Sequence, residues 1–124
     1  MSKIEDLLPD FDDMNSLANI VARKKIDADQ CKLQLDTKIA ECVRKAYTDH
    51  QYWINGKPPT QSFIDSVVKV VGNSVEDSEI ISTLYAAYRT TLREAEESAN
   101  LLENMRNQVQ AFQTISANRR QGLL

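Results

Sequence analysis

The sequence predicts an all-α protein, and more specifically an antiparallel long helical hairpin with a short inserted helix, assembled into an oligomeric bundle. Three observations lead to this prediction. The 124 residues include only three Gly and three Pro, and residues of high helix propensity are abundant. Two long stretches of the chain contain neither breaker. Between them, the segment Tyr52–Pro59 has one Gly and two successive Pro, which should end one helix and turn the chain back.

The chain divides by composition into an acidic N-terminal arm, residues 1–13, and a helical hairpin domain, residues 14–124. The arm carries a net charge of −4, and because the whole chain carries −3, the remainder carries +1. Apolar residues of the arm are spaced as on one face of a short helix, which Pro9 interrupts. The arm is either a disordered or docked tail, or a segment that recognises a basic partner or covers a basic site. Its candidate partner-binding residues are Ile4, Leu7, Leu8 and Phe11.

The first long helix is expected to run from about Met14 to Trp53 or Ile54, with Asp12 or Asp13 as its N-cap. Apolar residues recur along it every seven positions and form a heptad-like seam. A second apolar set also recurs every seven residues and lies roughly opposite the first, at about 100° per residue. The main seam is Met14, Val21, Ala28, Leu35 and Cys42, and the second is Ile26, Leu33, Ala40 and Tyr47.

After the turn, a short helix is expected over Phe63–Val71, with Thr60 or Ser62 as its N-cap. Its apolar face would be Phe63, Val67, Val70 and Val71, although this Val-rich run also fits a short strand. Gly72-Asn73 should end it. The next segment opens with a capping box made by Ser74 and Asp77, and the last helix should run from about Val75 to Ala117 or Asn118.

This pattern also predicts self-association. One partner helix within the chain covers only one of the two apolar faces of the first helix. A two-helix hairpin encloses little core for a chain of this size. A homo-oligomer would cover the second face.

Motifs of catalysis and of cofactor binding are not found in the sequence. There is no Gly-rich phosphate loop, nucleophile elbow or helical HExxH, so we expect neither an enzyme nor a cofactor. A single histidine, His50, and two cysteines give no metal-site spacing. On one helix Cys31 and Cys42 would lie about 16 Å apart, too far for a disulfide. No apolar run is long enough to span a membrane and the N-terminus does not resemble a signal peptide, which predicts a soluble cytoplasmic protein.

The hinge end of the predicted hairpin gathers cations and aromatic residues. Such a combination suits sequence-independent binding of single-stranded DNA, because cations neutralise phosphates and rings stack on bases. The alternative is that Tyr52 and Trp53 pack the turn against Phe63 and Tyr85 while the cations are merely solvated. The candidate nucleic-acid-binding residues are Arg44, Lys45, Tyr52, Trp53, Lys57 and Lys69.

The order of these features resembles the UvsY family of recombination mediators from T-even-type phages. That family has an acidic arm and a long helix that ends in a Tyr-aromatic-x-Gly-basic turn, which Tyr52–Lys57 matches with one extra residue. A basic pair precedes the turn closely in the family, whereas here the nearest cations are Arg44 and Lys45.

The resemblance implies a ring-like homo-oligomer that binds single-stranded DNA. Such a protein would load a RecA-type recombinase while displacing a single-strand-binding protein, in the host cytoplasm if the protein is phage-encoded. The alternative hypothesis is a structural or adaptor coiled-coil protein that self-assembles and binds only proteins.

Overall fold

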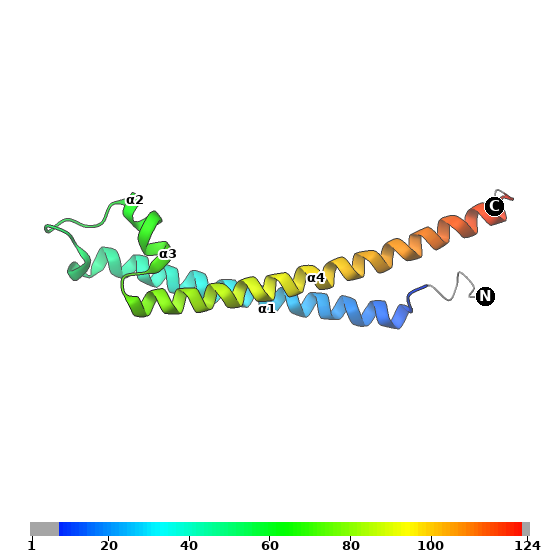
Figure 1. Ribbon diagram of the computed structural model, residues 1–124, viewed down its shortest axis with the longest axis horizontal. Helices are drawn as coiled ribbons and strands as arrows, with labels where there is room; N and C mark the ends of the chain where they lie inside the picture. Colours follow the sequence, from blue (N-terminus) through cyan, green and yellow to red (C-terminus); the bar gives the residue numbers. More distant parts are fainter. Residues whose placement is uncertain (1–7, 123–124) are drawn as a thin grey trace. The chain divides into compact units, whose positions relative to one another are not determined.

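The computed structural model describes residues 8–122, which fold into helices joined by turns, with no β-strand in that range. This confirms the predicted all-α helical hairpin with a short inserted helical segment (Figure 1). The inserted segment is built from three short helical pieces of different winding. The elements are α1 (Phe11–Thr48), the 3₁₀ turn η2 (His50–Tyr52), α2 (Gln61–Phe63), the π-helix η3 (Ile64–Val68), α3 (Lys69–Val71) and α4 (Val75–Arg120).

The first long helix, α1, begins three residues earlier than expected. The Asp10 carboxylate accepts a hydrogen bond from the Asp12 backbone N–H at 3.0 Å, and the Met14 backbone N–H donates to the Asp10 carbonyl at 2.9 Å. The N-cap predicted at Asp12 or Asp13 was therefore wrong, because both residues lie in the first turn. Carboxylates in a first turn are favourable since they face the positive end of the helix dipole.

The same helix ends at Thr48 rather than at Trp53 or Ile54. Asp49 explains the early stop, because its carboxylate accepts hydrogen bonds from the Gln51 backbone N–H at 3.2 Å and from Gln51 Nε2 at 2.6 Å. An Asp side chain that satisfies backbone donors ahead of it favours a turn over continued helix. The chain then winds into η2, whose N-cap is Asp49.

The chain forms two compact units, one comprising Ile26–Leu92 and the other combining the residues up to Lys25 with those from Arg93 onward. In each unit a stretch of α1 runs antiparallel to a stretch of α4 (Figure 1). Apolar side chains of the main seam are buried in both units, which confirms the heptad prediction from position 21 onward. The buried members of the α1 seam are Val21, Ala28, Leu35 and Cys42. The buried residues of α4 are Ile81, Ala95 and Leu102.

Residues Asn55 and Gly56 form a tight two-residue turn. Both have positive φ, +52° and +71° respectively, as a type I′ turn requires. The backbone N–H groups of Ile54 and Lys57 donate to each other's carbonyls at 3.2 and 3.0 Å. Gly56 therefore closes a turn in the connecting segment. The sequence had suggested instead that it ends the first helix, and that assignment was wrong.

The inserted segment 61–71 is helical, so the alternative prediction of a strand was wrong. Thr60 is its N-cap, as expected, with its hydroxyl accepting from the Phe63 backbone N–H at 3.2 Å. The predicted apolar face is displaced, because Ile64 and Val68 are the buried residues. Phe63, Val70 and Val71, which were expected to face the core, are exposed.

Gly72 and Asn73 end the inserted segment, as predicted, and α4 follows. Ser74 accepts from the Asp77 backbone N–H at 3.1 Å, which is one half of the expected capping box. The Asp77 carboxylate returns to the Asn73 backbone N–H at 3.1 Å, one residue before the usual partner. The helix continues to Arg120, slightly past the expected Ala117 or Asn118.

Of the four candidate partner-binding residues in the arm, Ile4 and Leu7 lie outside the described residues. Leu8 is partly buried, and Phe11 opens α1 with 75% of its surface exposed. Three acidic residues assigned to the arm belong to the N-terminus of α1. These are Asp10, which caps it, and Asp12 and Asp13 in its first turn.

Candidate nucleic-acid interface

A shallow pocket lies beside the turn that follows η2. Its volume is about 280 Å³, and its lining includes Tyr52, Lys57 and Phe63. The hydrogen-bonded turn at Asn55-Gly56 fixes the position of Lys57, and the Thr60 cap fixes that of Phe63. The pocket therefore combines a cation with two aromatic side chains, one of which, Phe63, is 41% exposed.

Phe63 is a candidate residue that sequence reasoning missed, because it was assigned to the core face of the inserted helix. The pocket lies close to the end of α1 as well. There the Tyr47 hydroxyl donates to Gln61 Oε1 at 3.3 Å, which ties the last turns of α1 to the start of the inserted segment. The segment that carries Phe63 is therefore attached to α1 through this hydrogen bond.

Trp53 and its neighbour Tyr52 lie in different surroundings, because Tyr52 lines the pocket and Trp53 does not. The Trp53 indole packs on the His50 imidazole, with ring centroids 4.2 Å apart and an interplanar angle of 35°. Its Nε1 atom is shielded from solvent and has no hydrogen-bond partner among the described residues. Trp53 is partly buried and is not among the residues that line the pocket. Its ring therefore serves the packing of the turn.

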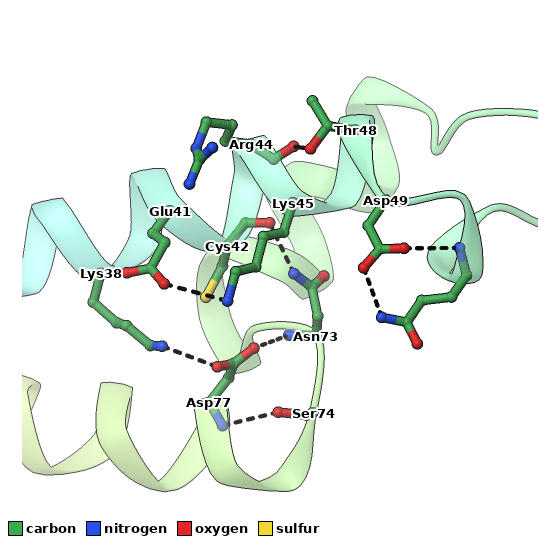
Figure 2. Close-up of polar contacts among 11 residues, drawn as sticks. Lys38, Glu41, Cys42, Arg44, Lys45, Thr48, Asp49, Asn73, Ser74 and Asp77 are labelled. Carbon is green, nitrogen blue, oxygen red and sulfur yellow. Dashed lines mark hydrogen bonds and ion pairs between the residues drawn. The ribbon is translucent and has the colours of Figure 1, made fainter.

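Two of the predicted cations are held by carboxylates one helical turn away. Lys45 Nζ lies 3.3 Å from Glu41 Oε1, and Lys69 Nζ lies 2.9 Å from Asp65 Oδ1 (Figure 2 draws the first pair). The hydrogen bonds from Lys69 and then from Gln61 keep the pKa of Asp65 below its usual value. Among the described residues, Arg44 and Lys57 have no carboxylate within ion-pair distance. These two are the cations most available to a phosphate.

A polar network joins α1 to the start of α4 beneath this region (Figure 2). Lys38 Nζ lies 3.0 Å from Asp77 Oδ1, and Asn73 Nδ2 donates to the Cys42 carbonyl at 2.8 Å. The Lys38 hydrogen bond lowers the pKa of Asp77, and the same hydrogen bond raises the pKa of Lys38. Burial raises the pKa of the Cys42 thiol. Through these contacts the network attaches the turn that contains Asn73 to α1, so its role is structural.

Within residues 8–122, no group of three or more His, Cys, Asp or Glu side chains has the arrangement of a metal site. In the same range, no helix combines the length and the apolar character that crossing a membrane requires.

Comparisons with known proteins add no further evidence. The chain matches no protein-family model, and neither the curated proteins nor the solved structures contain a significant match to it.

Proposed function

We propose that this protein binds single-stranded DNA as a homo-oligomer and acts as an accessory protein of recombination that loads a RecA-type recombinase. The observation that carries the DNA-binding part is the pocket in which Tyr52, Phe63 and Lys57 meet. A cation beside accessible rings suits a flexible strand, because the ammonium neutralises a phosphate while a base stacks on a ring. The recombination part follows from the resemblance of the Tyr52–Lys57 turn to the UvsY family.

We propose self-association as part of the same function, for an energetic reason. One chain offers only a few phosphate contacts, from residues such as Arg44 and Lys57, and would bind weakly. Several chains held together bind one strand tightly, because each further contact becomes intramolecular. The second apolar set on α1 is exposed, with Leu33 67% accessible, and it provides a surface through which copies can associate.

A salt titration tests DNA binding directly. The affinity for a fluorescent single-stranded oligonucleotide is measured at several salt concentrations, and log K should fall linearly with log salt. Each phosphate contact contributes a slope of about −0.7 for single strands. The Lys57→Ala variant should have a shallower slope, by about 0.7 for each subunit that engages the strand.

Lys45→Ala is the matched control, since Lys45 is already paired with Glu41 and its loss should change the slope less. An affinity that is the same for oligonucleotides of different sequence is expected. No binding at low salt, or equal slopes for wild type and Lys57→Ala, would contradict the assignment of this pocket.

The alternative function is a structural or adaptor protein that binds only proteins. Ion pairing favours it, because Lys38, Lys45 and Lys69 each have a carboxylate partner and fewer cations are left for phosphate. A stable oligomer without measurable affinity for single-stranded DNA at low salt would support this function instead.

A further inference from the structure

The turn at Asn55-Gly56, beside the pocket, carries two groups that can react with each other. Both residues are exposed, and apart from its chain neighbours no atom lies within 4 Å of the position that a Gly56 Cβ would take. The Gly56 backbone N–H donates no backbone hydrogen bond within residues 8–122. Because glycine has no Cβ to block the approach, this nitrogen can attack the carboxamide of the preceding asparagine. The turn therefore brings a nucleophile, an electrophile and water together.

The other asparagines are held away from this reaction. Asn73 is followed by the small residue Ser74, but its Nδ2 donates to the Cys42 carbonyl at 2.8 Å and its backbone N–H donates to Asp77 Oδ2 at 3.1 Å. Asn73 is also half-buried, so its carboxamide cannot swing toward the next nitrogen. Every remaining asparagine lies within one of the two long helices, where the backbone N–H groups are engaged in hydrogen bonds. The structure thus separates Asn55 from the rest.

We propose that Asn55 is a site of spontaneous deamidation. The Gly56 nitrogen forms a bond to Asn55 Cγ, the bond from Cγ to Nδ2 breaks, and ammonia leaves with the proton of the Gly56 N–H. Water then opens the cyclic imide, giving its hydroxyl to a carbonyl carbon and its proton to the nitrogen. Opening at Cγ restores the main chain and leaves an aspartate, whereas opening at the main-chain carbonyl leaves an isoaspartate.

Two hydrogen bonds limit the rate in the folded protein. The Ile54 and Lys57 backbone N–H groups donate to each other's carbonyls across the turn, and the attack requires the turn to open. An exposed turn closed by two backbone hydrogen bonds opens at low cost compared with global unfolding. The folded protein should therefore react more slowly than the unfolded chain, and only at this asparagine.

Deamidation acts on the pocket through Lys57, which follows the reactive residue by two positions. Among the described residues, Lys57 has no carboxylate within ion-pair distance. One further negative charge takes the net charge of the chain from −3 to −4, and the new carboxylate competes with phosphate for the ammonium. Isoaspartate also inserts a methylene into the main chain of a turn that needs two residues of ordinary backbone. This loss of DNA affinity rests on the proposed function, whereas the deamidation itself does not.

Peptide mapping tests the modification. Trypsin does not cut before Pro58, so it places Asn55 and Asn73 in separate peptides, 46–69 and 70–89, and neither contains another asparagine. After incubation of the intact protein in warm, mildly alkaline buffer, peptide 46–69 should show the small mass increase that replacement of an amide by a carboxyl group produces. Peptide 70–89 should not change.

Urea-unfolded protein supplies the reference for that experiment. If peptide 46–69 of the folded protein stays unmodified while the unfolded chain reacts there, the proposal is overturned. Equal modification of both peptides in the folded protein would overturn the selection of Asn55 by the structure. Isoaspartyl methyltransferase, which labels isoaspartate and not aspartate, identifies the isoaspartate product.

Two variants connect the modification to DNA binding. Asn55→Asp carries the charge of the product on an ordinary backbone, and Asn55→Gly removes the amide while keeping a pair of residues suited to a type I′ turn. Asn55→Asp should bind the single-stranded oligonucleotide about two- to fivefold more weakly than fresh wild type, the effect of one exposed charge pair. Asn55→Gly should bind like fresh wild type, and incubation should weaken the wild type alone.

The outcomes separate the two proposals. Equal affinities of Asn55→Asp and fresh wild type would overturn the effect on the pocket and leave the modification standing. No binding by fresh wild type would overturn the proposed function instead, while the peptide map would still report on Asn55.

Discussion

Lys38 Nζ lies 3.0 Å from Asp77 Oδ1, and the two side chains retain only 16% and 13% of their exposure. The pair joins the C-terminal third of α1 to the first turn of α4. Because the same carboxylate also accepts from the Asn73 backbone N–H, it holds the end of the inserted segment in place. A sheltered ion pair with a further hydrogen bond contributes more than an exposed one.

We predict that Asp77→Asn lowers the unfolding free energy at pH 7 by about 1.5–3 kcal/mol, the usual range for a hydrogen bond to a charged group. The pKa of Asp77 is lowered in the folded protein. Its stabilising effect is therefore complete above its ordinary pKa near 4 and is lost as pH falls through the lowered value. Urea unfolding from pH 7 down to strongly acidic pH should show a steeper loss for the wild type than for Asp77→Asn.

Asp65→Asn is the matched control for that experiment. Asp65 also has a lysine partner and a lowered pKa, but its side chain is exposed, and solvent screens such pairs. Its substitution should change stability much less. Equal effects of the two substitutions would contradict the importance given to the Lys38–Asp77 pair.

Gly72 should tolerate no side chain. Its φ of +70° and ψ of −156° fall in a region that essentially only glycine adopts, and an added Cβ would collide with the Asp77 Cβ. Gly72→Ala should lower the unfolding free energy by about 2–4 kcal/mol. Gly56→Ala is the comparison, since Gly56 also has positive φ but open space around it, and it should cost about 1–2 kcal/mol. Thermal melts of the two variants in parallel would separate backbone strain from the collision.

The pair Leu35 and Leu33 separates folding from association. Leu35 is 6% exposed and lies in the core cluster, so Leu35→Asp should unfold the unit, because a buried unpaired carboxylate is costly. Leu33→Asp should retain its helicity and melt cooperatively. Circular dichroism measures both. A folded Leu35→Asp variant would mean that this part of the core is less tightly packed than the structure indicates.

Tyr52 and Trp53 should respond in opposite ways. Trp53→Ala removes the stacking contact with His50 and should lower the unfolding free energy by about 1–3 kcal/mol without altering the salt slope of DNA binding. Tyr52→Ala should weaken binding by about 1–3 kcal/mol, the range for a stacked base, with a smaller effect on stability. Melting and fluorescence titration of both variants decide this. A large loss of DNA affinity in Trp53→Ala with an unchanged melting temperature would assign the stacking role to Trp53.

The long helices were predictable because their signals repeat. Val21, Ala28 and Leu35 occupy the same heptad position, so one error in a helix boundary does not change which face is buried. The ends of α1 depend on single side chains, and three nearby Asp residues could each act as the cap. The turn at Asn55-Gly56 did have a recognisable signal, since Asn-Gly is the usual sequence of a type I′ turn, but Gly56 was assigned to a helix end.

The inserted segment could not be predicted residue by residue. A π-helix has a wider turn than an α-helix, so η3 changes the residues that face inward, and Ile64 and Val68 become buried instead of Phe63 and Val70. Nothing in a run of valines marks this change of winding. The ion pairs of Lys45 and Lys69 could have been predicted from the sequence, because Glu41 and Asp65 precede these lysines by four residues.

The difference between the two cysteines has a practical consequence for chemical labelling. Cys42 is buried and its thiol has a raised pKa, so it supplies little of the thiolate that reacts with a maleimide. Cys31 is partly exposed on the same helix. A maleimide dye at neutral pH should therefore attach to Cys31 of the folded protein and spare Cys42. The wild-type sequence thus provides one attachment point on α1 for a fluorophore or a spin label.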